Sequence, residues 1–188
     1  MIFTKCPRHK NEIERNGLSI QLFGESVPVS NEAEFLGVQF DTRLTWEPQT
    51  QKMLSKAYKR LNLLRSVATL TKHPKPENLL KIYNATIKSI FEYASVCILN
   101  AADNHIEKLQ LIQNQALRVI LKTPAYVAIK DLHDCSGLPT IRSHLTDFAK
   151  KRLSAMKKVS PLIVKVIEEY RTVQHINENK SLFDIIGT

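Results

Sequence analysis

The spacing of hydrophobic residues changes once along this chain, close to residue 46. Before that point apolar and polar residues alternate with the two-residue period of β-strands, and after it apolar residues recur every three or four positions, as in α-helices. Four short strands are predicted, over residues 1–4, 18–22, 27–29 and 33–40. Gly24 to Ser26 predicts a hairpin turn, and Pro28 favours an edge position for the third strand. Because these strands have no covering helix of their own, they must pack on the helices that follow or on a missing partner.

Prolines and glycines divide the rest of the chain into helices. The first is predicted from Pro48 to Leu70, with one apolar stripe formed by Met53, Ala57, Leu61, Leu64 and Ala68. Further helices are predicted over residues 76–99, from Asp103 as N-cap to Pro124, over 126–135 before Gly137, from Pro139 through Met156, and over 161–170. A polar tail, 171–188, follows. The predicted fold is therefore α+β, with a short antiparallel region followed by about five or six helices. Three parts are expected, over residues 1–46, 47–123 and 124–188.

Composition narrows the class of protein without identifying it. The chain of 188 residues is 43% hydrophobic and 24% charged, which is typical of globular domains. Its longest apolar runs are far shorter than the roughly 20 residues of a membrane span, and the N-terminus carries no secretion signal. Three scattered cysteines argue against a disulfide framework. We therefore expect an intracellular protein of the nucleus or cytoplasm, neither secreted nor bound to a membrane.

The positive charge is concentrated in the first helices. The net charge is +9, and residues 47–100 contribute nine basic and three acidic side chains, or +6. In the first predicted helix Lys52, Lys56 and Lys59 fall on one line opposite the apolar stripe, with Arg60 beside it. This line fits a ridge that follows nucleic-acid phosphates, but lysines are also common on solvated helix faces. The pattern alone leaves both interpretations open.

The sequence offers little for catalysis. It contains no glycine-rich phosphate loop, no Gly-x-Ser-x-Gly and no His-Glu-x-x-His. Glu168-Glu169 is the only adjacent pair of acids, and His133-Asp134-Cys135 matches no zinc pattern. Cys6 and His9 lack two further ligands nearby. We expect no catalytic and no metal-binding residue, so that the chain does not look like a complete enzyme.

One motif links the strands to the first helix. Residues 35–46 read Phe-Leu-Gly-Val-x-x-Asp-x-x-Leu-x-Trp, which resembles a signature of reverse transcriptases from non-LTR retrotransposons, particularly the jockey-like elements of arthropods. Residues 109–120 are similar to the Ile-Gln-x-x-Gln-Asn-x-x-Leu-Arg helix of that family, and residues 138–141 to its Leu-Pro-x-Ile step. The resemblance covers nearly the whole chain, and the order and spacing of its pieces together are specific.

The resemblance implies a C-terminal fragment of such an RNA-directed DNA polymerase. It implies the last strands of the palm, with a primer-grip-like region at Phe35, Leu36 and Gly37, and then a helical thumb and connecting helices. RNA and RNA–DNA template–primer duplexes are the implied partners, together with the missing fingers and palm. The intact family enzyme holds magnesium on paired aspartates that are absent here, so this fragment is expected to bind no cofactor and to be inactive alone.

The family's thumb grips duplex mainly through the backbone, and this matches the basic line on the first helix, Lys52, Lys56, Lys59 and Arg60. Glu34 and Gln49 depart from the family pattern, which often has Lys and His there, and Glu34 brings a negative charge close to the implied phosphate path. Trp46 is expected to pack strand against helix. A helical protein-interaction module and a non-functional retroelement remnant remain the alternatives.

Overall fold

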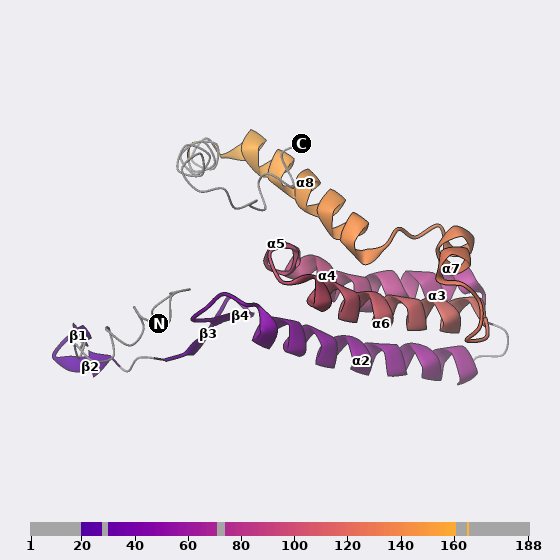
Figure 1. Cartoon of the computed structure of the whole chain (residues 1–188), viewed down its shortest axis with the longest axis horizontal. Helices are drawn as coiled ribbons and strands as arrows, with labels where there is room; N and C mark the ends of the chain where they lie inside the picture. Colours follow the sequence, from indigo (N-terminus) through magenta and orange to yellow (C-terminus); the bar gives the residue numbers. More distant parts are fainter. Residues whose placement is uncertain (1–19, 28–29, 71–73, 161–164, 166–188) are drawn as a thin grey trace. The chain divides into compact units, whose positions relative to one another are not determined.

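The computed structural model describes residues 20–27, 30–70, 74–160 and 165 (Figure 1). The chain divides into two compact units, Met1–Lys52 and Met53–Thr188. The strand predicted over residues 1–4 and the tail over 171–188 lie outside the described residues, and of the helix predicted over 161–170 only Lys165 is described. The predicted α+β class is confirmed. The division into three parts stays a prediction.

In the described part of the first unit, the strands form two antiparallel hairpins. They pair β1 (Ile20–Leu22) with β2 (Glu25–Val27), and β3 (Glu32–Phe35) with β4 (Val38–Asp41). The single strand predicted over residues 33–40 is therefore wrong, because the chain reverses at Leu36 and Gly37. Their φ angles of 48° and 78° give the two left-handed residues of a type I′ turn, which suits the twist of a tight hairpin. The first hairpin likewise turns at Phe23 and Gly24, one residue earlier than predicted.

Asp41 organises the connection from β4 to the first helix. Its Oδ2 accepts hydrogen bonds from the backbone N–H of Thr45 at 2.9 Å and from the Thr45 hydroxyl at 3.0 Å, and its Oδ1 accepts from the Trp46 N–H at 3.0 Å. The Trp46 side chain is only 9% exposed and meets the Phe40 ring edge-on at 5.3 Å between centroids. The predicted packing role of Trp46 is thereby confirmed. Leu44 and Trp46 both have positive φ, a strained conformation that this carboxylate and the ring contact hold in place.

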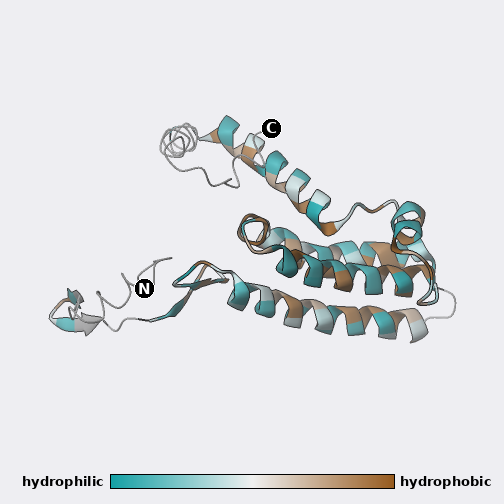
Figure 2. Cartoon of the chain, viewed as in Figure 1, coloured by the Kyte–Doolittle hydropathy of each residue, from teal (hydrophilic) through white to brown (hydrophobic). Residues whose placement is uncertain are grey.

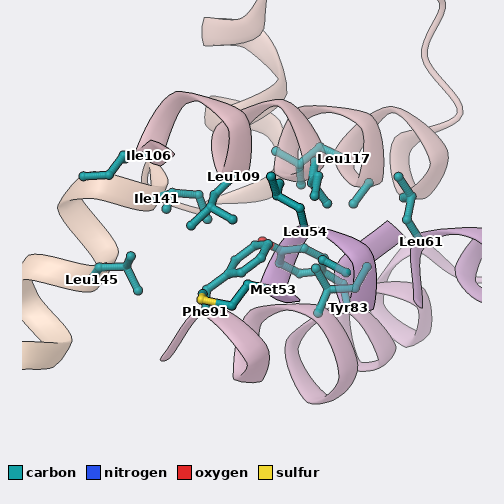
Figure 3. Close-up of a cluster of buried hydrophobic side chains, with 14 of the residues drawn as sticks. Met53, Leu54, Leu61, Tyr83, Phe91, Ile106, Leu109, Leu117, Ile141 and Leu145 are labelled. Carbon is teal, nitrogen blue, oxygen red and sulfur yellow. The ribbon is translucent and has the colours of Figure 1, made fainter. Parts of the chain in front are cut away.

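The second unit is a helical array with one hydrophobic core. Its helices are α2 (Glu47–Leu70, which begins in the first unit), α3 (Pro76–Tyr83), the π-helical segment η1 (Asn84–Lys88), α4 (Ser89–Tyr93), α5 (Ser95–Leu99), α6 (Asp103–Leu121), α7 (Ile129–Ser136) and α8 (Ile141–Val159). Most of the predicted stripe on the first helix is buried, with Ala57, Leu61 and Leu64 fully covered and Ala68 partly buried. Apolar faces alternate with polar ones along the helices (Figure 2). Side chains from α2, α3, α4, α6 and α8 meet in the core (Figure 3).

The helix predicted over residues 76–99 is interrupted twice. Its buried residues Leu79, Tyr83, Ile87 and Phe91 are spaced by four, whereas an α-helix repeats every 3.6 residues. The wider π-turn of η1 compensates for this drift and keeps the four side chains on the core. A second break falls at Ala94, where φ is −107° and ψ is 24°.

Several helix ends differ from the predicted ones by a few residues. Asp103 is the first residue of α6 and not its N-cap, and its carboxylate pairs with Arg142. Thr140, not Pro139, precedes α8, and its hydroxyl accepts from the Ser143 N–H. Helix α7 begins three residues later than predicted and ends as expected at Gly137, whose φ of 67° closes the helix.

Candidate nucleic-acid interface

A groove in the second unit carries basic side chains along one wall. Lys56, Lys59 and Arg60 of α2 line it, and all three side chains are exposed. The opposite wall consists of Ala85 and Thr86 from η1 and of Ser89 and Ile90 from α4, and the groove holds about 650 Å³. No carboxylate lies among these lining residues. The groove therefore presents an uncompensated positive potential beside small, weakly polar side chains.

The π-helical segment shapes the second wall. Thr86 and Ser89, three residues apart, both line the groove. The Thr86 hydroxyl donates to the Ile82 carbonyl at 2.7 Å, and the Ser89 hydroxyl donates to the Ala85 carbonyl at 2.8 Å. Sequence reasoning missed this wall. The run of buried residues spaced by four was the available signal for the π-turn, but which helix faces α2 depends on tertiary packing.

Lys52 shares the predicted line with Lys56 and Lys59, but its side chain has different partners. Its Nζ lies 2.8 Å from a carboxylate oxygen of Glu34 and donates to the Gly37 carbonyl at 3.2 Å. Glu34, the departure from the family pattern, is thus the counter-ion of Lys52. The charge of Lys52 is partly neutralised within the first unit.

The predicted primer-grip-like residues form the tip of the β3–β4 hairpin. Phe35 is 66% exposed and Leu36 is 75% exposed, and Gly37 completes the turn between the strands. Two large apolar side chains at an exposed tip are unusual for a solvated turn. Their role in binding nucleic acid stays a prediction. They belong to the first unit, whereas the basic groove lies in the second.

Polar side chains of the motif at 109–120, on α6, form hydrogen bonds with the connection between α7 and α8. The Gln110 side chain accepts from the Ile141 N–H at 2.8 Å, and its Nε2 lies 2.8 Å from Asn114 Oδ1 and 3.2 Å from His133 Nε2. Gln113 donates to the Pro139 carbonyl at 3.1 Å. The two motifs at 109–120 and 138–141 therefore meet in space, and their polar residues satisfy main-chain groups.

Arg118 completes this scaffold at the other end of α6. Its guanidinium donates to the carbonyls of Pro124 at 2.8 Å and Val127 at 3.0 Å, and so holds the loop before α7. The three reactive residues at 133–135 differ in their surroundings. His133 is held by the Leu138 carbonyl at 2.7 Å, while Asp134 and Cys135 are exposed.

Hydrogen bonds and burial determine the state of several ionisable groups among the described residues. No three metal-binding side chains cluster among them. Asp41, the carboxylate of the motif at 35–46, uses both oxygens for protein donors, so it does not fit a magnesium site. Partial burial opposes its ionisation, but the donors from Thr45 and Trp46 outweigh this and lower its pKa. Burial raises the pKa of the Cys97 thiol and of the Tyr83 hydroxyl, so both groups are uncharged near neutral pH.

Within the described residues no helix has both the length and the apolar character to cross a bilayer. No protein-family model and no solved structure matches the chain.

Three curated proteins are similar to most of the chain. It is 23% identical over 161 residues to a probable RNA-directed DNA polymerase from transposon BS of Drosophila melanogaster. This match covers 84% of this chain and 17% of that protein. It is 25% identical over 158 residues to the corresponding protein of transposon X-element from the same species, covering 82% and 17%. It is 24% identical over 132 residues to the RNA-directed DNA polymerase from mobile element jockey of Drosophila funebris, covering 70% and 14%. The chain thus spans less than a fifth of the length of these relatives. The predicted resemblance is confirmed: the chain is similar to a fragment of the RNA-directed DNA polymerases of non-LTR retrotransposons.

Proposed function

We propose that this chain is a duplex-binding segment of a reverse transcriptase and holds template–primer through the basic groove between α2 and η1. The observation that carries the proposal is the convergence of Lys56, Lys59 and Arg60 on a groove without a carboxylate. Phosphates are pure acceptors with negative charge, and Lys and Arg are their usual protein partners. The groove residues lie outside the motifs at 35–46, 109–120 and 138–141.

The partner that fits best is an RNA–DNA or RNA duplex contacted along its backbone. In this proposal residues 1–46 are the end of the palm, residues 47–123 the thumb, and residues 124–188 the connecting helices. Phe35, Leu36 and Gly37 contribute a second contact at the hairpin tip. The paired aspartates and their magnesium ions belong to the missing fingers and palm, so this chain alone binds without polymerising.

Binding should depend steeply on salt. Each phosphate neutralised by Lys or Arg contributes about 0.7–0.9 to the slope of log affinity against log salt. Three groove cations therefore predict a slope of roughly −2 to −3. Fluorescence anisotropy with a labelled RNA–DNA duplex between low and moderate salt would measure this slope, and a flat dependence would refute the proposal.

Matched variants separate the groove from the general positive charge of the chain. Replacing Lys56, Lys59 and Arg60 together by alanine should weaken binding strongly and remove most of the slope. Replacing Lys151, Lys157 and Lys158 of α8 by alanine removes the same charge from exposed positions outside the groove and should have a much smaller effect. Lys52→Ala should also change affinity little, because Glu34 already neutralises this lysine. Equal losses in the two triple variants would contradict the proposed site.

A further inference from the structure

We infer that the wall of the groove formed by η1 and α4 recognises ribose 2′-hydroxyl groups, so that the groove selects an RNA strand over a DNA strand. This inference rests on the proposed function, because it assumes that Lys56, Lys59 and Arg60 hold phosphates on the opposite wall. It assigns Thr86 and Ser89 as the residues that determine sugar specificity.

The hydroxyl groups on this wall can only accept further hydrogen bonds. A hydroxyl carries one proton and two lone pairs, and a carbonyl oxygen cannot donate. Thr86 lies 2.7 Å from the Ile82 carbonyl, and Ser89 lies 2.8 Å from the Ala85 carbonyl, so the single proton of each hydroxyl is used within the helix. What remains toward a ligand is a pair of acceptors, three residues apart, on the same wall of the groove.

This pattern distinguishes the two sides of a nucleic-acid strand. Phosphate oxygens are acceptors only, so they match the cations of α2 and are not matched by a wall of acceptors. A ribose 2′-hydroxyl can donate, and deoxyribose has no donor at that position. The two other residues of the wall, Ala85 and Ile90, are apolar and suit the carbon atoms of the sugar. A strand lying in the groove with phosphates toward α2 would thus place its riboses toward Thr86 and Ser89.

The test compares duplexes that differ only in the 2′-substituent. One is an RNA–DNA hybrid, and the other carries 2′-fluoro groups in its RNA strand, which keep the sugar geometry of RNA but cannot donate. The wild-type chain should bind the 2′-hydroxyl duplex about fivefold to tenfold more tightly, because each neutral hydrogen bond shifts a binding constant severalfold. The combined variant Thr86→Val, Ser89→Ala should bind both duplexes with the affinity that the wild type has for the 2′-fluoro duplex.

Two controls make the outcomes distinguishable. Ser66 and Thr69 of α2 also donate to main-chain carbonyls, Asn62 and Arg65, but do not line the groove. Ser66→Ala with Thr69→Val should therefore leave the preference for 2′-hydroxyl intact. Equal affinity of the wild type for the two duplexes, with steep salt dependence, would overturn this inference while leaving the proposed function standing. A flat salt dependence in the wild type would overturn both.

Discussion

Replacing Gln110 by alanine removes the centre of the polar network that ties α6 to the beginning of α8. The Gln110 carbonyl accepts the Ile141 N–H at 2.8 Å, and Ile141 is the first residue of α8, where a backbone N–H has no partner inside the helix. The Gln110 amide group faces acceptors on Gln113, Asn114 and His133 at 3.0, 2.8 and 3.2 Å. Alanine leaves this donor and these acceptors without their partner and also leaves a small void.

The size of the effect follows from these contacts. A buried donor or acceptor left without a partner costs about 1–3 kcal/mol, and the lower part of that range applies because the groups are only partly buried. The Gln110 amide has two N–H protons and so donates to at most two of these acceptors. With one backbone donor and up to two acceptors affected, we expect a loss of roughly 2–4 kcal/mol in the free energy of unfolding. For a chain of this size each kcal/mol lowers the melting temperature by about 2–4 °C.

Urea unfolding followed by far-UV circular dichroism would measure the loss, with Gln115→Ala as the matched control. Gln115 is on the same helix, and its side-chain oxygen accepts from the exposed guanidinium of Arg65, so its replacement should cost less than about 0.5 kcal/mol. Faster hydrogen exchange at the Ile141 amide should accompany the loss in Gln110→Ala. Similar unfolding free energies for the two variants would refute the assigned role. Duplex affinity below the unfolding transition should stay unchanged, because Gln110 lies outside the basic groove.

Two further outcomes follow from the ionised groups that hold main-chain atoms. The pKa of Asp41 is lowered in the folded chain, so its stabilisation is present above about pH 4, the unfolded value, and is lost as the pH falls through the folded pKa. The difference in urea midpoint between wild type and Asp41→Asn, followed by the fluorescence of Trp46, should therefore shrink below that pH; a constant difference down to about pH 2 would contradict it. Arg118→Lys should speed amide exchange between residues 123 and 129 almost as much as Arg118→Ala, because a lysine cannot bond two carbonyls as the guanidinium does. Full protection in the lysine variant would show that charge alone suffices.

The helices were predictable because their apolar stripes are long and regular. The β3–β4 hairpin was missed for a local reason. Type I′ turns favour Asn-Gly or Asp-Gly, whereas here Leu36 occupies the first left-handed position, so an apolar run continues through the turn. The π-turn was missed because periodicity arguments assume 3.6 residues per turn, and a wide apolar face hides a change in that number.

The candidate site was predictable only on the side of α2. Helical spacing identified Lys56, Lys59 and Arg60, but it placed Lys52 with them because periodicity ignores contacts from other elements. Glu34 is 18 residues away in the sequence, and only the folded β3 strand brings it to Lys52. Thr86 and Ser89 carry no signal of their own, since hydroxyl residues on a helix are usually solvated.

The cations of the groove lie outside the motifs at 35–46, 109–120 and 138–141, whereas Phe35, Leu36 and Gly37 belong both to the first motif and to the proposed contact. Asp41, Gln110 and Arg118 lie within the motifs, and each binds main-chain N–H or carbonyl groups. These motifs can therefore persist in a fragment because they are needed for folding, whether or not the fragment meets nucleic acid. The basic groove provides the evidence for retained binding. Its cations lie outside the motifs and their side chains are exposed, so folding constrains them little and they would be free to change in a remnant without function. Their convergence on one groove favours a chain that still binds.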